Sequence, residues 1–128
     1  MAETIFPEYD WQSISHRKPD IVLLNKQTQE CIIVEVTIPY DLYLNMAKDA
    51  KKTRYKPYCA LLEKYHYKTK LIVLCFGSLG IIDRDVRSGL LYFKPNSEKL
   101  KKLLQWCSLS VIIGSNYIWR SRVKKLLR

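Results

Sequence analysis

Two acidic residues, Asp20 and Glu35, have the residue type and spacing of a metal site. Each carboxylate borders or interrupts a run of apolar and β-branched residues that is typical of a β-strand. In an antiparallel strand pair, directly opposed side chains have Cβ atoms about 5 Å apart. Two like charges that close are unfavourable unless a cation lies between them, and Mg²⁺ and Mn²⁺ prefer carboxylate oxygens. The two residues therefore predict a divalent metal site.

A β-hairpin is the element that must bring these carboxylates together. Residues 21–25 and 31–37 are the strand-like runs, and the polar residues 26–30 between them are typical of a turn. If paired residues have numbers that sum to 55, Asp20 lies opposite Glu35. Two simpler interpretations stay open, because an Asp before a strand is often a turn residue and a Glu can lie on a strand edge facing water. The apolar neighbours of Glu35 favour a buried strand, where an unpartnered carboxylate would cost several kcal/mol.

The sequence also carries an excess of positive charge. Twenty-two Lys and Arg residues against twelve Asp and Glu residues give a net charge of +10 for 128 residues. The basic residues concentrate in residues 48–70, where tyrosines are interleaved with them, and again in residues 120–128. This composition indicates a polyanionic partner, with nucleic acid as the first candidate. The alternative is that the basic residues are solvated helix faces and the tyrosines are half-buried packing residues.

Four cysteines, Cys31, Cys59, Cys75 and Cys107, show no CxxC pairing. Three of them lie in apolar periodic segments and are expected to be small buried hydrophobic residues. This argues against zinc or a disulfide framework and favours a reducing, intracellular or nuclear compartment. No apolar run approaches the roughly 20 residues of a membrane span, so no membrane partner is expected.

After the hairpin, the pattern predicts a long helix. Apolar residues recur at three- and four-residue steps from Leu42 to about Tyr65, and Asp41 is a candidate N-cap. Pro57 should kink or divide this helix, because its ring clashes with the preceding turn.

The rest of the chain predicts a third strand and two C-terminal helices. Residues 70–76 have strand composition, and residues 81–95 fit either a strand or a helical turn. A capped helix should begin at residues 96–97, and a separate basic amphipathic helix should end near Leu127. This order favours a single α/β domain over residues 1–128, with a small mixed β-sheet flanked by helices.

The chain resembles the PD-(D/E)xK nuclease superfamily, and specifically the restriction-like endonuclease domain of non-LTR retrotransposon polyproteins. The matching segments are Arg17-Lys18-Pro19-Asp20-Ile21-Val22, residues 33–41, 50–55 and 72–80, and the basic helix near 110–128. The resemblance implies a restriction-endonuclease-like core at about residues 16–95, followed by basic helices at about 96–128. It also implies an endonuclease that nicks target DNA with Mg²⁺ or Mn²⁺, as part of a larger reverse-transcriptase polyprotein.

In that family the PD aspartate and the acid of the next strand hold the metal, which implies Asp20 and Glu35 here. The carbonyl of Val36 is a further expected ligand, and His16 is a secondary candidate beside the site. The usual superfamily lysine corresponds to Thr37, which is a departure from the pattern. An additional N-terminal acid is expected among Glu3, Glu8 and Asp10.

These retrotransposon domains are similar in carrying the lysine on the following helix, which implies Lys51 or Lys52. Lys51 is four residues before Tyr55 and shares its helix face, whereas Lys52 points about 100° further round, toward solvent. We therefore expect Lys51 to be the catalytic cation. Lys52 is then a phosphate contact, with Lys18, Arg54 and Tyr55 as further nucleic-acid contacts.

Two other functions stay open. The same fold without metal chemistry would be a catalytically inactive module that binds nucleic acid, and a basic protein-interaction domain is a third class. A homodimer would suit cleavage of both DNA strands.

Overall fold

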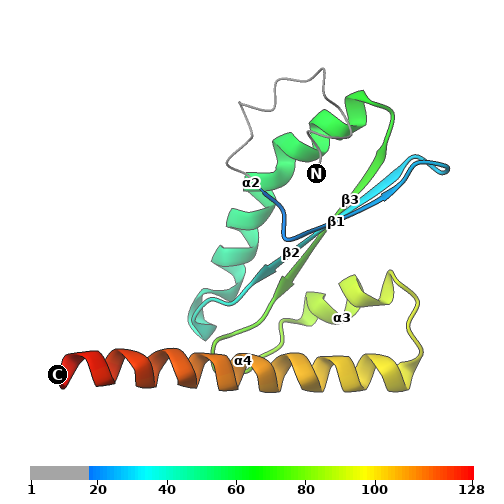
Figure 1. Cartoon of the computed structure of the whole chain (residues 1–128). Helices are drawn as coiled ribbons and strands as arrows, with labels where there is room; N and C mark the ends of the chain where they lie inside the picture. Colours follow the sequence, from blue (N-terminus) through cyan, green and yellow to red (C-terminus); the bar gives the residue numbers. More distant parts are fainter. Residues whose placement is uncertain (1–17) are drawn as a thin grey trace.

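A three-stranded mixed sheet is the centre of this computed structural model, which describes residues 18–128. The elements in chain order are β1 (Ile21–Asn25), β2 (Glu30–Thr37), the 3₁₀-helix η2 (Asp41–Tyr43), α2 (Leu44–Lys64), β3 (Lys68–Cys75), α3 (Arg84–Leu91) and α4 (Ser97–Leu126) (Figure 1). The strand order is β1-β2-β3, with β1 antiparallel and β3 parallel to β2. The expected α/β class and mixed sheet are therefore confirmed.

The hairpin of β1 and β2 has the predicted register. Its pairs run from Ile21 opposite Val34 to Asn25 opposite Glu30, so that paired numbers sum to 55. The side chain of Asn25 closes the turn by accepting hydrogen bonds from the N–H groups of Gln27 and Thr28, at 3.0 and 3.1 Å. This local turn chemistry fixes which residues of the two strands face each other.

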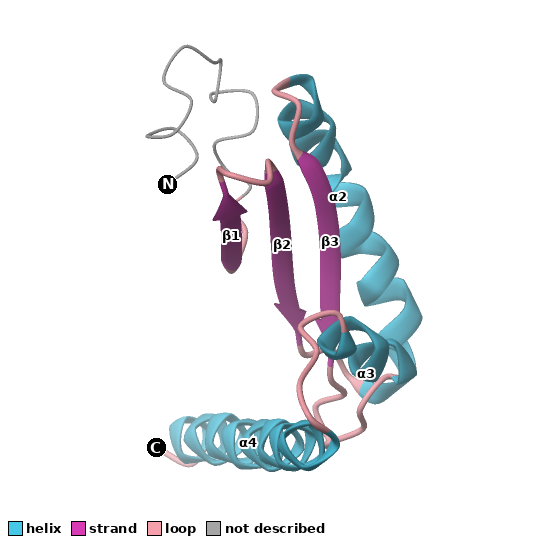
Figure 2. Ribbon diagram, turned by 90° about the vertical axis from the view of Figure 1, so that its right-hand side faces the viewer, coloured by secondary structure: helices cyan, strands magenta, loops and turns pink. Residues whose placement is uncertain are grey.

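Helix α2 connects β2 to β3 and covers one face of the sheet (Figure 2). Its buried side chains pack against the β2 residues Cys31 and Ile33, and the group includes Tyr55, Tyr58 and Leu62. These helical positions follow the three- and four-residue steps of a single helix face. Burial of this face drives the helix onto the sheet.

A division of α2 at Pro57 and a cap at Asp41 were expected from the sequence, and both are wrong. Pro57 lies inside the continuous range Leu44–Lys64, so a kink at this residue stays a prediction. Packing of Tyr55 and Tyr58 on either side of the proline outweighs the loss of one backbone hydrogen bond. Asp41 is not the N-cap of α2. It lies in η2, and its carboxylate accepts a hydrogen bond from the N–H of Leu79 in the loop after β3, at 3.1 Å.

The opposite face of β3 is covered by α3, which resolves the ambiguity of residues 81–95. Asp83 caps this helix by accepting a hydrogen bond from the N–H of Asp85, at 3.1 Å. Gly89 lies so close to β3 that an added Cβ would be 2.9 Å from a methyl carbon of Ile72. A second core forms here, with Phe76, Val86 and Val111 at its centre.

Helix α4 is one continuous helix of 30 residues, whereas the sequence predicted two. Its start was predicted correctly, because Asn96 accepts a hydrogen bond from the N–H of Lys99 at 2.7 Å. Residues 108–114 contain Gly114 but no proline, so nothing removes a backbone hydrogen bond and the helix continues. Ser108 donates a hydrogen bond to the carbonyl of Gly80 at 2.7 Å, which anchors the middle of α4 to the loop after β3.

The expected burial of the cysteines is confirmed for Cys31 and Cys75, whereas Cys59 and Cys107 are half-buried. All four are free thiols. Burial raises the pKa of the Cys31 thiol to about 11, so this side chain is a neutral packing residue at physiological pH. Within residues 18–128, no helix is both long enough and apolar enough to cross a membrane.

Candidate active site

Asp20 and Glu35 are held together at the entrance to β1. The backbone N–H of Asp20 donates a hydrogen bond to Oε1 of Glu35 at 2.8 Å. In return, Oδ2 of Asp20 accepts a hydrogen bond from the backbone N–H of Val36 at 2.8 Å. Each carboxylate therefore bonds to backbone on the other strand, which fixes both acids relative to each other. The paired register ends at Ile21 opposite Val34, so its continuation by one residue places Asp20 opposite Glu35.

Glu35 is a buried carboxylate with a direct charge partner. Its side chain is 1% exposed, and Nζ of Lys51 lies 2.8 Å from its Oε2. A charge at such a depth is tolerated only when it is paired and hydrogen-bonded, and both conditions are met here. The sequence argument assigned the compensating charge to a metal ion alone, but Lys51 already supplies one positive charge to this carboxylate.

Lys51 reaches Glu35 because it belongs to the buried face of α2. Positions 48, 51, 55, 58 and 62 follow three- and four-residue steps, and the last three are Tyr55, Tyr58 and Leu62 in the core. The buried face of α2 therefore carries apolar residues toward the C-terminal end of the helix and lysines toward its N-terminal end. Lys52 lies beside this face, is exposed, and lines a shallow hollow with Lys70 rather than the carboxylate pair.

Tyr55 fixes the backbone that leads into the site. Its hydroxyl donates a hydrogen bond to the carbonyl of Lys18 at 3.0 Å, which fixes the segment before β1. Burial and the adjacent negative charge of Glu35 raise the pKa of Tyr55 to about 12, so the hydroxyl keeps its proton. Nζ of Lys51 and Cζ of Arg54 lie 6.0 and 5.9 Å from the ring centroid.

This contact gives Tyr55 a different role from the nucleic-acid contact that the sequence suggested, and it gives Lys18 a backbone role in addition to the suggested one. Tyr55 is 2% exposed, so it positions the chain and offers little surface to DNA. Lys18 contributes its backbone carbonyl to the site, and its exposed side chain is available for a phosphate contact. The backbone partner of a tyrosine has no sequence signature, which is why this contact was missed.

The donor atoms at the site fit a hard divalent cation. Asp20 and Glu35 provide carboxylate oxygens beside the backbone of Val36, whose carbonyl is the third expected donor. Between residues 18 and 128 there is no group of three or more His, Cys, Asp or Glu side chains that could hold a metal by themselves. Mg²⁺ commonly uses one or two carboxylates and completes its shell with water and substrate phosphate. His16 and the candidate acids Glu3, Glu8 and Asp10 lie outside the described residues.

A second charged cluster lies one helical turn from Lys51 and was not found from the sequence. Nζ of Lys48 is 2.9 Å from Asp83 and 2.8 Å from Asp85, and hydrogen bonds to these acids raise the pKa of Lys48. The cluster ties the N-terminal half of α2 to the start of α3. The sequence held one sign of this cluster: acidic residues at positions 83 and 85, before an apolar residue, are typical of a helix N-terminus.

Comparisons with models of protein families, with curated proteins and with solved structures gave no match to this chain.

Proposed function

We propose that this chain is a metal-dependent endonuclease domain that nicks DNA by phosphodiester hydrolysis. The observation that carries the proposal is the contact of Lys51 with Glu35 at 2.8 Å, next to an Asp20 that is hydrogen-bonded into the same site. Two acids and a lysine from the following helix are the arrangement that the resemblance to retrotransposon restriction-like endonuclease domains implies. On this proposal the sheet and α2 are a restriction-endonuclease-like core.

Each residue of the site has a separate role in the proposed reaction. Asp20, Glu35 and the carbonyl of Val36 would hold Mg²⁺ or Mn²⁺, and the bound ion would lower the pKa of a water and offset the charge of the scissile phosphate. Lys51 places a fixed positive charge beside the phosphate oxygens, where negative charge develops during hydrolysis. Tyr55 keeps Asp20 in place through its hydrogen bond to the carbonyl of Lys18. The exposed Lys52 and Arg54 contact phosphates away from the scissile bond.

One observation favours a second function, a nucleic-acid-binding module without hydrolysis. Lys51 already balances the charge of Glu35, so the folded site is electrostatically satisfied without a metal ion. The net charge of +10 would still attract DNA. The two functions share a ligand but differ in whether a phosphodiester bond is broken.

Plasmid nicking with matched variants separates them. We expect Mn²⁺-dependent nicking by the native chain, and about a 100-fold or larger loss in Asp20→Asn, Glu35→Gln and Lys51→Met, because each removes a charge that acts on the reacting groups. Lys52→Met and Glu30→Gln are the controls, since they change an exposed lysine next to Lys51 and an exposed glutamate on the same strand. The measurement is the rate of supercoiled plasmid loss, with circular dichroism to confirm folding of each variant.

The outcomes are distinct. Nicking that is equally fast in Glu35→Gln and in Glu30→Gln would contradict the proposed hydrolysis. DNA binding that persists in every variant, without any nicking by the native chain, would support the binding module instead.

A further inference from the structure

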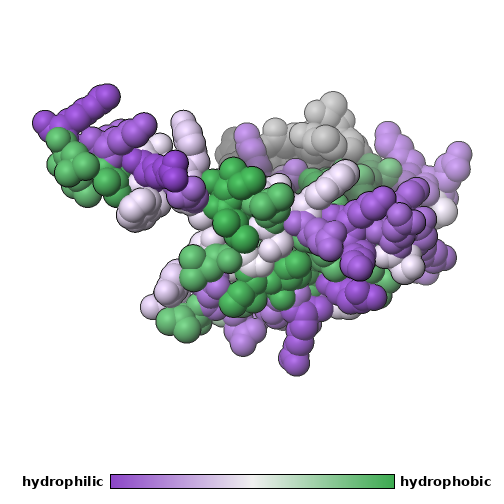
Figure 3. All heavy atoms as spheres, turned by 90° about the horizontal axis from the view of Figure 1, so that it is seen from below, coloured by the Kyte–Doolittle hydropathy of each residue, from purple (hydrophilic) through white to green (hydrophobic). Residues whose placement is uncertain are grey.

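The buried face of α4 continues beyond the body of the protein. Leu100, Leu104, Cys107 and Val111 follow four- and three-residue steps. Val111 belongs to the second core, Leu104 and Cys107 pack against it, and Leu100 is buried. The same face continues as Ser115, Ile118 and Arg122, and no residue after Val111 is fully buried. Figures 1 and 3 show the C-terminal end of α4 projecting past the sheet.

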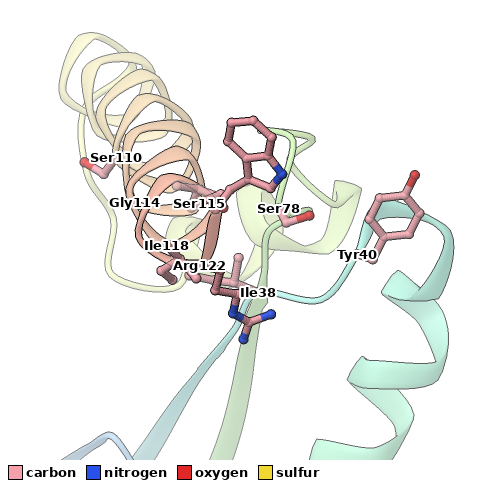
Figure 4. A pocket seen from close by; sticks show the side chains of 10 residues that line it. Ile38, Tyr40, Ser78, Ser110, Gly114, Ser115, Ile118 and Arg122 are labelled. Atoms are coloured by element: carbon pink, nitrogen blue, oxygen red, sulfur yellow. The ribbon is translucent and has the colours of Figure 1, made fainter. Parts of the chain in front are cut away.

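A groove lies between this projecting helix and the ends of the strands. It has a volume of about 660 Å³, and its lining includes Ile38, Tyr40, Ser78, Ile118, Trp119 and Arg122. Figure 4 shows the labelled side chains of α4 on one side of the groove and those of Ser78 and Tyr40 on the other. Its surface is mainly apolar and aromatic, with one guanidinium group among the lining side chains.

The charge of α4 limits what can fill this groove. Residues 99–128 contain eight Lys or Arg residues and no Asp or Glu. A polyanion or a strongly acidic surface complements the charge of such a helix. A second copy of this chain would bring two such helices together, which like-charge repulsion opposes.

The groove also lies close to the carboxylate site. Ile38 is one residue beyond the end of β2 and three residues after Glu35. At about 3.3 Å per residue of extended chain, the two positions are separated by roughly 10 Å along β2. The backbone positions of Glu35 and of the groove-lining Ile38 are therefore at most about 10 Å apart.

We propose that this groove binds an unpaired stretch of single-stranded DNA beside the nuclease site. Trp119 and Tyr40 provide aromatic surfaces for exposed base faces, and Arg122 with its basic neighbours on α4 contacts the phosphates. In a duplex the base faces are covered by stacking, so a duplex presents few apolar surfaces for this groove to contact. The inference rests on the proposed function only in taking DNA as the ligand, and it requires no hydrolysis.

Binding is measured with the full chain in EDTA, so that no cleavage occurs. Fluorescence anisotropy compares a labelled 20-nucleotide oligo(dT) with a labelled 20-base-pair duplex. We expect Trp119→Ala to weaken oligo(dT) binding about tenfold or more, because loss of one base-aromatic stack has an effect of that size. Trp106→Ala is the control, since Trp106 lies on the same helix, is 68% exposed against 64% for Trp119, and does not line the groove.

The arginines give an independent comparison. Arg122 lines the groove and Arg120 does not, although both are exposed on α4. Arg122→Gln should weaken oligo(dT) binding several-fold more than Arg120→Gln. The affinity for the duplex should change equally in the two variants, because a uniform phosphate contact is lost in each.

Several results would overturn the inference. Equal effects of Trp119→Ala and Trp106→Ala on oligo(dT) binding, or a loss of duplex binding as large as that of oligo(dT), would exclude a single-strand groove. A native chain that is a dimer in sedimentation experiments, and a monomer as Trp119→Ala, would show that a second copy fills it. The Glu35→Gln variant separates this inference from the proposed function, because oligo(dT) binding should persist there whether or not the native chain nicks DNA.

Discussion

The contact between Lys51 and Glu35 serves both the stability and the proposed chemistry of the site. Glu35 is buried among apolar residues of β2, and an unpaired charge there would destabilise the fold. Lys51 removes that penalty, and its ammonium then remains beside the carboxylates where phosphate would lie. Substitution of Lys51 therefore changes stability as well as nicking, so its kinetic effect has to be measured below the unfolding temperature of the variant.

Tyr55 gives the protein a specific response to alkaline pH. Its pKa is raised from 10.0 to about 12 by burial and by Glu35, so the folded state favours the neutral phenol. The stabilisation is fully present below pH 10 and is lost as the pH rises from 10 to 12, because the unfolded chain loses this proton first. We expect the free energy of unfolding to fall over this range by at most about 3 kcal/mol from this residue, at about 1.4 kcal/mol per pKa unit.

The test compares two phenylalanine variants by urea unfolding at pH 8 and at pH 11. Tyr55→Phe should lose part of the alkaline decrease that the native chain shows, and Tyr117→Phe should retain all of it, because Tyr117 is exposed. An identical pH dependence in the two variants would contradict the assigned role of Tyr55.

At the scale of elements, the N-terminal half of α2 is fixed by charge rather than by apolar packing. Lys48 and Lys51 occupy the helix face that carries Tyr55, Tyr58 and Leu62 further along. Lys51 meets Glu35 of β2, and Lys48 meets the acids at the start of α3. The two lysines thus connect α2 with both neighbouring elements around the proposed site.

This cluster predicts unequal effects of its members on stability. Lys48→Met should destabilise the fold by about 3 kcal/mol, because it leaves the carboxylate of Asp83, whose side chain is 9% exposed, without its charge partner. Asp85→Asn should have a much smaller effect, since that side chain is 48% exposed and well solvated. Chemical unfolding of each variant measures both.

The double variant Lys48→Met with Asp83→Asn is the matching control. It removes the uncompensated charge and should recover part of the lost stability. A double variant less stable than Lys48→Met alone would show that the carboxylate of Asp83 has other stabilising contacts.

The elements differ in how far the sequence determined them. The hairpin register was predictable, because strand periodicity and the turn after Asn25 act locally. A shift of the pairing by one residue would move every side chain of the strand to the other face of the sheet. The position of Lys51, rather than Lys52, beside Glu35 followed from helix geometry for the same reason.

Expectations failed where tertiary packing decides. The sequence left residues 81–95 open between a strand and a helical turn, and residues 84–91 become helical because Asp83 caps α3 and Val86 fills a core built by β3 and α4, which are contacts from distant parts of the chain. Pro57 was given too much weight as a helix breaker, since packing on the sheet outweighs its local propensity. The two C-terminal helices expected from the sequence are joined in α4 by one uninterrupted hydrogen-bond ladder.

At the scale of the whole molecule, the packed core and much of the positive charge are in different places. The core lies in the sheet, α2, α3 and the first half of α4, and its last buried residue is Val111. Five basic residues follow in the projecting end of α4, at positions 120, 122, 124, 125 and 128. Viewed from below, hydrophobic residues gather near the base of this projection, and both hydrophilic and hydrophobic residues lie toward its tip (Figure 3).

This separation predicts that the projecting end contributes to DNA binding more than to folding. Deletion of residues 116–128 should leave the thermal midpoint within a few degrees of the native value, because no fully buried side chain is removed. The same deletion should weaken duplex binding and flatten its salt dependence, since the logarithm of the binding constant falls by about 0.9 per phosphate contact for each tenfold rise in salt. With five basic residues removed, the slope should decrease by at most about 4.5. A deletion that unfolds the chain would show that the end of α4 stabilises the core, and an unchanged slope would show that its charges do not touch the DNA.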